Sequence, residues 1–89
     1  MTKEEIQKYL EDRNVTVLTA DGFDEAFLGI SCDQPPRAIY DYDKMIEILQ
    51  RDMSYEDAVE YFDYNIGGSY VGPQTPLYIV RPDREEDES

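Results

Sequence analysis

Apolar residues recur every three or four positions in three parts of this chain, which is the spacing of one face of an α-helix. The first part follows Thr2 and runs to about residue 13. Thr2 and Glu5 fit a capping box, in which the side chain of each residue bonds the backbone N–H of the other. The other two parts cover 42–53 and 54–66. The pattern therefore predicts an N-terminal helix and a central pair of helices.

Short apolar runs between these helices have the alternation or the β-branched composition of strands. The predicted strands are 15–19, 26–32, 37–40 and 77–80. Pro35 and Pro36 lack the N–H groups that a ladder needs, so they are predicted to form the connection between the second and third strands. That connection makes a hairpin. The alternation also puts Cys32 on the buried face of its strand, as a small core residue.

Together these elements predict an α+β fold: a small antiparallel sheet of three or four strands, with the N-terminal helix and the helix pair packed on it. One domain is expected over 1–81, since a chain of 89 residues supports one modest core. From residue 82 to 89 the chain contains no apolar side chain after Pro82 and five carboxylates. This composition predicts an acidic, disordered tail.

The segment 54–66 is the most informative of the predicted helices. Ser54 and Asp57 fit a second capping box, and Gly67-Gly68 predicts a stop with positive φ. At about 100° per residue, five side chains gather on the face that is predicted to be buried. They are Tyr55, Ala58, Val59, Phe62 and Ile66. The opposite face is acidic.

That outer face combines carboxylates with tyrosines and has no Lys or Arg between Ser54 and Gly68. Its members are Glu56, Glu60 and Asp63, flanked by Asp57, Tyr61 and Tyr64. Like charges four residues apart cost a helix a few tenths of a kcal/mol, so helix stability does not account for this composition. Tyrosine is enriched in protein interfaces. We therefore predict that these six residues contact a partner; the alternative, that the tyrosines pack internally beside solvated carboxylates, stays open.

The charge of the whole chain restricts the class of partner. With 21 acidic and 8 basic residues the formal net charge is −13, which repels nucleic acids and anionic membrane surfaces. No direct nucleic-acid or membrane binding is expected. A basic surface of another protein is the complementary partner, and the alternative is that the acidity serves only solubility. The sequence does not determine the oligomeric state.

Residues for catalysis are scarce. The chain has no histidine, which removes the commonest general base and most zinc sites, and the sequence predicts no enzyme, metal or cofactor. Two acidic groups remain as an alternative site for a divalent ion. They are Asp21, Asp24 and Glu25, and the pair Asp41 and Asp43. A single cysteine and the absence of a signal-peptide pattern predict a reducing cytoplasm.

The phrase YEDAVEYFDYNIGGSYVGPQTP, with ADGFDEAFLGI and AIYDYDKMIEIL before it, resembles a family of short, uncharacterised proteins of tailed bacteriophages. The resemblance spans about 20–79 and does not include the acidic tail. It implies expression in the cytoplasm of a bacterial host during infection. It implies no catalytic residues. By family-level analogy, small acidic phage proteins often bind host or defence proteins.

The leading hypothesis is therefore a non-enzymatic phage accessory protein. It binds and inhibits a host or defence nucleic-acid-binding protein through the acidic, tyrosine-bearing surface, as a nucleic-acid mimic. A small oligomeric or virion-associated structural protein is the second hypothesis. An enzyme that uses carboxylates and a divalent metal is the third.

Overall fold

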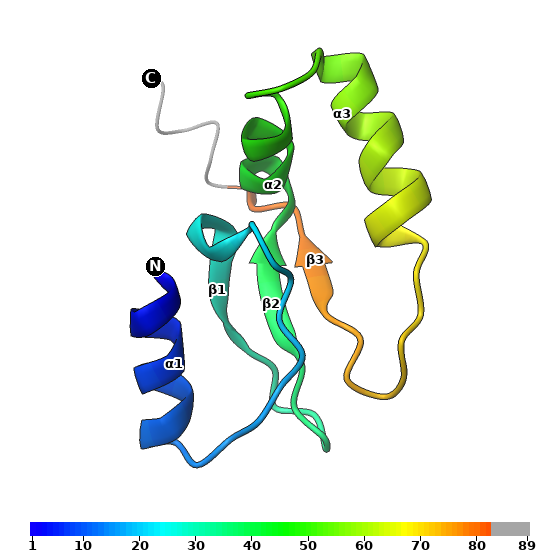
Figure 1. Ribbon diagram of the computed structural model, residues 1–89. Coiled ribbons are helices and arrows are strands. Elements are labelled where there is room, and N and C mark those ends of the chain that lie inside the picture. Colours follow the sequence, from blue (N-terminus) through cyan, green and yellow to red (C-terminus); the bar gives the residue numbers. More distant parts are fainter. Residues whose placement is uncertain (83–89) are drawn as a thin grey trace.

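The computed structural model describes residues 1–82, which form helices on a three-stranded sheet (Figure 1). The α-helices are α1 (Lys3–Asp12), α2 (Tyr42–Leu49) and α3 (Tyr55–Phe62), and the π-helical turn η2 (Asp63–Gly67) continues α3. The strands are β1 (Phe27–Ile30), β2 (Ala38–Asp41) and β3 (Leu77–Ile79), and the short 3-10 helix η1 (Asp24–Ala26) precedes β1. The predicted α+β class is confirmed. The predicted tail, apart from Pro82, lies outside the described residues.

The helices begin where their capping residues predict. In α1 the Glu5 N–H donates to Thr2 Oγ1 at 3.1 Å, and the Thr2 N–H donates to the Glu5 carboxylate at 2.8 Å, which completes the capping box. Ser54 accepts from the Asp57 N–H at 3.2 Å at the start of α3. Asn14, with φ of 57°, follows the end of α1. Satisfied end groups and an apolar face explain why these short segments are helical.

The sheet has the order β1-β2-β3 and is mixed. Strands β1 and β2 form the predicted antiparallel hairpin, whereas β2 and β3 are parallel. The wholly antiparallel sheet was therefore wrong for this second pair. Both central helices lie between β2 and β3 in the chain, and such a crossover brings the next strand back in the same direction.

The predicted strand at 15–19 is an extended connection without ladder partners among the described residues. It crosses one face of the sheet (Figure 1). Side chains hold it there: the Ala20 N–H donates to the Tyr40 hydroxyl at 2.7 Å, and Gln74 Nε2 donates to the Thr16 carbonyl at 2.7 Å. The strand predicted at 15–19 from its β-branched composition was therefore wrong. That composition did not specify the hydrogen-bond partners.

A continuous row of aromatic rings runs from α1 across the sheet to α3 and α2. We call it the aromatic row; in order, its rings are Tyr9, Phe27, Tyr40, Tyr78, Phe62 and Tyr42. Phe27, Tyr40 and Tyr78 are cross-strand neighbours in register and therefore lie on one face. Most neighbouring rings meet edge to face at centroid distances from 4.9 to 6.0 Å, a favourable geometry for aromatic pairs.

Two predicted burial assignments were wrong. Cys32 is exposed because β1 ends at Ile30, so Cys32 lies in the connection to β2 and not in the strand. Leu28 is also exposed, at a bulge between Phe27 and Gly29. Tyr55 is exposed at the first turn of α3, whereas Ala58 and Phe62 of the same predicted face are buried. The first turn of α3 thus extends past the edge of the core.

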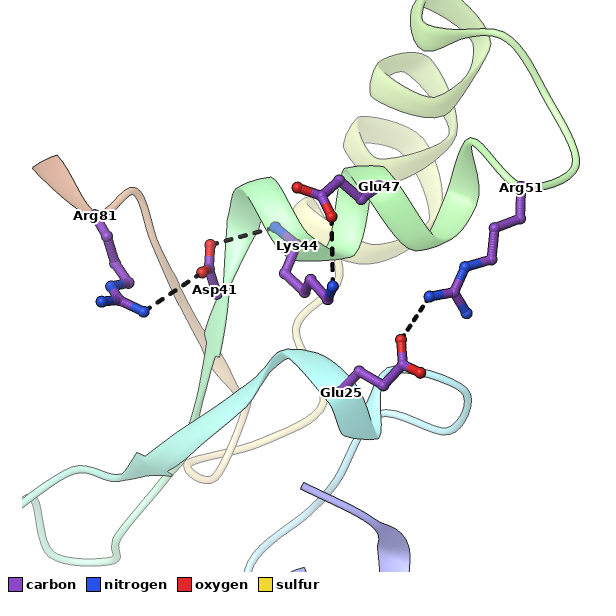
Figure 2. Close-up of polar contacts among 6 residues, drawn as sticks. All are labelled: Glu25, Asp41, Lys44, Glu47, Arg51 and Arg81. Carbon is purple, nitrogen blue, oxygen red and sulfur yellow. Dashed lines mark hydrogen bonds and ion pairs between the residues drawn. The ribbon is translucent and has the colours of Figure 1, made fainter. Parts of the chain in front are cut away.

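Three ion pairs lie around α2 and the end of β2, and two of them link separate parts of the chain (Figure 2). Arg51 contacts Glu25 at 2.6 Å and Lys44 contacts Glu47 at 3.4 Å. Asp41 is almost fully buried at the end of β2, where it accepts from the Lys44 N–H at 3.3 Å and lies 3.9 Å from Arg81. This carboxylate therefore joins the start of α2 to the chain that follows β3. No helix among residues 1–82 is long and apolar enough to cross a membrane.

Replacing Tyr40 by phenylalanine tests the anchor of the 15–20 connection. The change leaves the aromatic row in place and removes the acceptor of the Ala20 N–H, so the free energy of unfolding should fall by about 1 kcal/mol. Urea denaturation measures this. Tyr78→Phe is the matched control and should change stability by less than about 0.5 kcal/mol. Equal effects of the two changes would show that the anchor contributes nothing.

The Glu25–Arg51 pair gives a pH-dependent test. The hydrogen bond and the charge of Arg51 hold the pKa of Glu25 below its ordinary value. A lowered folded-state pKa contributes stability that is present above the unfolded pKa and is lost as the pH falls through the folded pKa. Arg51→Gln should therefore raise the pKa of Glu25, as followed by NMR titration of its side-chain carboxyl carbon. An unchanged pKa would mean that the pair does not form in solution.

Candidate protein-binding site

The orientation of α3 is set by its contact with the aromatic row. Phe62 lies edge-on to Tyr42 at 4.9 Å and to Tyr78 at 5.1 Å, and Ala58 is fully buried one turn earlier. Gly67 allows η2 to close over this ring, because a Cβ at Gly67 would lie 2.7 Å from Phe62 Cε1. The expected positive φ at Gly67-Gly68 was wrong, since neither glycine has one. The close packing against the Phe62 ring explains why residue 67 is a glycine.

With this face buried, the opposite face of α3 and η2 is turned away from the sheet. All six residues of the predicted contact surface are exposed. Tyr61 keeps 44% of its surface accessible and Tyr64 keeps 80%. The alternative in which these two tyrosines pack internally is therefore contradicted.

The eight tyrosines of the chain divide into two sets. Four belong to the aromatic row, and the other four are exposed and lie between residues 55 and 70. The exposed set is Tyr55, Tyr61, Tyr64 and Tyr70. Exposed aromatic side chains are thus concentrated on the segment that carries the acidic face.

None of the four carboxylates of this face forms an ion pair with a described Lys or Arg. The described cations lie on other elements, five of them in ion pairs, and Arg13 lies over the Tyr9 ring at 4.8 Å. Burial, followed by the charge of Asp63, raises the pKa of Tyr42. Asp63 is therefore close enough to Tyr42 for its charge to act on the phenol.

Part of the face is concave. A cleft of about 360 Å³ lies along α3 and η2, and we call it the acidic cleft. Its lining is Met53, Asp57, Glu60, Tyr61, Tyr64 and Asn65. Four of the six predicted contact residues line it, whereas Glu56 and Asp63 lie on the exposed surface outside it.

Two lining residues were not predicted. Met53 has the apolar spacing of the predicted helix 42–53, which places it on the buried face of that helix. It is only partly buried, however, and reaches the cleft from the turn between α2 and α3. Asn65 donates from Nδ2 to the Tyr61 carbonyl at 3.2 Å, which holds its amide back along the helix. The spacing of four residues between Tyr61 and Asn65 puts them on one side of a helix, and it is the feature of the sequence that could have indicated Asn65.

A regular α-helix was expected at residues 63–66, whereas η2 is a π-helical turn, a rare form that is frequent at functional sites.

The arrangement suits binding of a cation-bearing side chain. Carboxylates make strong, charge-assisted hydrogen bonds with Lys and Arg. Tyrosine rings at the same cleft add apolar area and a face for a cation–π contact.

The acidic groups considered for a divalent ion are arranged differently. Within residues 1–82, no three side chains of His, Cys, Asp or Glu come together to form a metal site. Glu25 is engaged by Arg51, and Asp41 by Arg81 and the start of α2. Asp21 and Asp24 line different clefts.

No protein-family model matches this chain, and neither the curated proteins nor the solved structures contain a significant match. The resemblance to proteins of tailed bacteriophages therefore stays a prediction from the sequence.

Reversing one charge in the acidic cleft should stabilise the fold. Glu60→Lys replaces a like-charge pair with Glu56 by an attractive i, i+4 pair and puts a cation near the end of α3, so the gain should be about 0.5 kcal/mol at low salt. Thermal unfolding at low ionic strength measures it. In 1 M salt the gain should vanish, which is the control. A loss of stability would mean that Glu60 makes a stabilising contact within the fold.

Proposed function

We propose that this chain is a non-enzymatic accessory protein of a tailed bacteriophage, acting in the cytoplasm of the bacterial host. It binds and inhibits a host or defence nucleic-acid-binding protein through the acidic face of α3 and η2. The observation that carries the proposal is the combination of four exposed carboxylates and two exposed tyrosines on a face with no Lys or Arg.

Charge and shape support a protein partner with a basic surface. The net charge of −13 attracts such a partner over a distance and raises the association rate, while it repels free nucleic acid. At the contact, the tyrosines supply buried area at a low cost in side-chain entropy. Because α3 is fixed by Phe62 and Ala58, the carboxylates are already placed before binding, and this lowers the cost of association.

A nucleic-acid-binding target follows from the spacing of the charges. Carboxylates one turn apart on a helix are about 5–6 Å from each other, which is comparable to phosphate spacing along a strand. A groove of Lys and Arg that binds phosphates is therefore complementary to this face. Occupation of that groove excludes the nucleic acid, so binding and inhibition are the same event.

The second candidate is a small oligomeric or virion-associated structural protein. Exposed Tyr64, Tyr70 and Val71 favour it, since apolar area of this kind is buried in self-interfaces. The uncompensated charge opposes it, because two copies would meet through like-charged faces. Light scattering separates the two candidates, and we expect a mass of one chain at all concentrations.

Charge reversal tests the proposed function directly. The double change Glu56→Lys and Glu60→Lys inverts two charges on the face and leaves the buried side of α3 untouched. The unmodified chain should capture a basic protein from infected or defence-expressing lysate at low salt, and the purified target should lose its nucleic-acid binding when the chain is added. The double variant should inhibit that target about tenfold less strongly.

The matched control reverses two exposed charges on α1, Glu4→Lys and Glu11→Lys, for the same change in net charge. It should inhibit nearly as well as the unmodified chain. If both double variants lose inhibition equally, net charge and not the α3 face is responsible. If neither loses inhibition, the proposed site is wrong.

A further inference from the structure

A second cleft lies beside the acidic cleft and is mainly apolar. It has a volume of about 440 Å³ and lies between the connection at 18–23, η2, the turn at 69–76 and β3. We call it the apolar cleft; its main apolar lining is Leu18, Phe23, Ile66, Val71, Pro76 and Tyr78. Leu18 and Val71 keep 44% and 60% of their surfaces accessible, so apolar area is exposed at its rim.

The walls of the apolar cleft are held by hydrogen bonds from three separate segments. Gln74 Nε2 donates to the carbonyls of Thr16 at 2.7 Å and Pro36 at 3.1 Å. Arg37 Nε donates to the Thr75 carbonyl at 2.6 Å. The volume and the fixed walls match those of preformed binding sites, which are usually 300–1,000 Å³ and lined by apolar side chains.

The turn that carries Val71 is itself rigid. The Val71 N–H donates to Thr75 Oγ1 at 2.9 Å, and Thr75 Oγ1 donates to the Gly72 carbonyl at 2.7 Å. Gly72 has φ of 116°, a conformation that residues with a side chain rarely adopt. The exposed side chain of Val71 is therefore held at the rim of the cleft.

The two clefts adjoin at Asn65. Asn65 lines both of them, and it is followed directly by Ile66 in the apolar cleft and preceded by Tyr64 in the acidic cleft. A ligand that crosses Asn65 therefore passes from carboxylates and tyrosine rings to an apolar surface within one turn of helix.

Charge favours a partner of another kind as the occupant of the apolar cleft. Residues 83–89 contain no apolar side chain that could fill it. A second copy would bring a second acidic face next to the first. A partner that places a cation in the acidic cleft has a complementary charge, and it can also supply an apolar side chain for the apolar cleft.

We propose that the two clefts form one bipartite docking site for a single segment of the partner, in which a Lys or Arg side chain lies next to a large apolar side chain. The cation occupies the acidic cleft and the apolar side chain crosses Asn65 into the apolar cleft. This inference rests on the proposed function and adds the chemistry of the recognised segment. The acidic cleft raises the association rate and makes binding depend on salt concentration. The apolar cleft contributes binding affinity that salt does not screen.

Two synthetic peptides test the proposal with the intact chain. The first has three arginines, two glycines and two leucines, and the second has serines in place of the leucines; both are made in the two chain directions. Each is titrated into the ¹⁵N-labelled protein and followed by NMR amide shifts. The leucine peptide should shift amides around both clefts and bind at least about threefold more tightly. The serine peptide should shift only amides around the acidic cleft.

The outcomes separate this inference from the proposed function. Equal affinities, with shifts confined to the acidic cleft, would overturn the bipartite site and leave the acidic face as the binding site. No shift with either peptide would count against both. Shifts confined to the apolar cleft and insensitive to salt would show that this cleft binds apolar ligands independently. That result would overturn the bipartite site.

Variants at the exposed rim provide the second measurement. Leu18→Ser with Val71→Ser removes apolar area without changing charge, and it should abolish the advantage of the leucine peptide while the serine peptide binds as before. Val80→Ser is the control, because Val80 is more exposed to solvent than Leu18 or Val71 but lines neither cleft. An advantage that persists in the double variant would overturn the assignment of the apolar cleft.

Discussion

The packing of Phe62 determines which face of α3 is exposed to solvent. In the aromatic row its ring lies between Tyr78 on the sheet and Tyr42 on α2. Gly67 also packs against this ring. Because Phe62 and Ala58 can be buried in only one rotation of α3, the acidic residues of the helix are forced outward. The row therefore stabilises the fold and orients the surface at the same time.

Charge is distributed unevenly around this core. The described Lys and Arg side chains lie on α1 and just after it, in the hairpin, on α2, in the turn between α2 and α3, and after β3; none lies on α3 or η2. Surface ion pairs contribute little to stability, so nothing in the fold requires this separation. A surface that keeps several carboxylates unpaired gains attraction for a cationic partner at a small cost in helix stability. The apolar cleft next to it adds a contact that does not depend on charge.

The sequence predicted the features that depend on local pattern. The capping box of α1, the Ser54 cap of α3, the two central helices and the hairpin follow from residue spacing, and so does the outward direction of Tyr61 and Tyr64. The reciprocal bond from Asp57 that a second capping box needs is absent. The sequence did not predict features that depend on distant partners. The connection at 15–19 has strand composition but is held by Tyr40 and Gln74, and β3 is parallel because the helix pair precedes it. The sequence predicted the acidic face but not its cleft, since the positions of Met53 and Asn65 depend on the α2–α3 turn and on η2.

Footprinting of the complex with the captured target tests the central claim most directly. Hydroxyl-radical labelling with mass spectrometry reports the accessibility of each tyrosine, and Tyr55 serves as an internal reference because it is exposed on the same helix outside the acidic cleft. Protection of Tyr61 and Tyr64 in the complex, with Tyr55 still labelled, is the expected result. Full labelling of Tyr61 and Tyr64 in a complex that protects residues elsewhere would contradict the account.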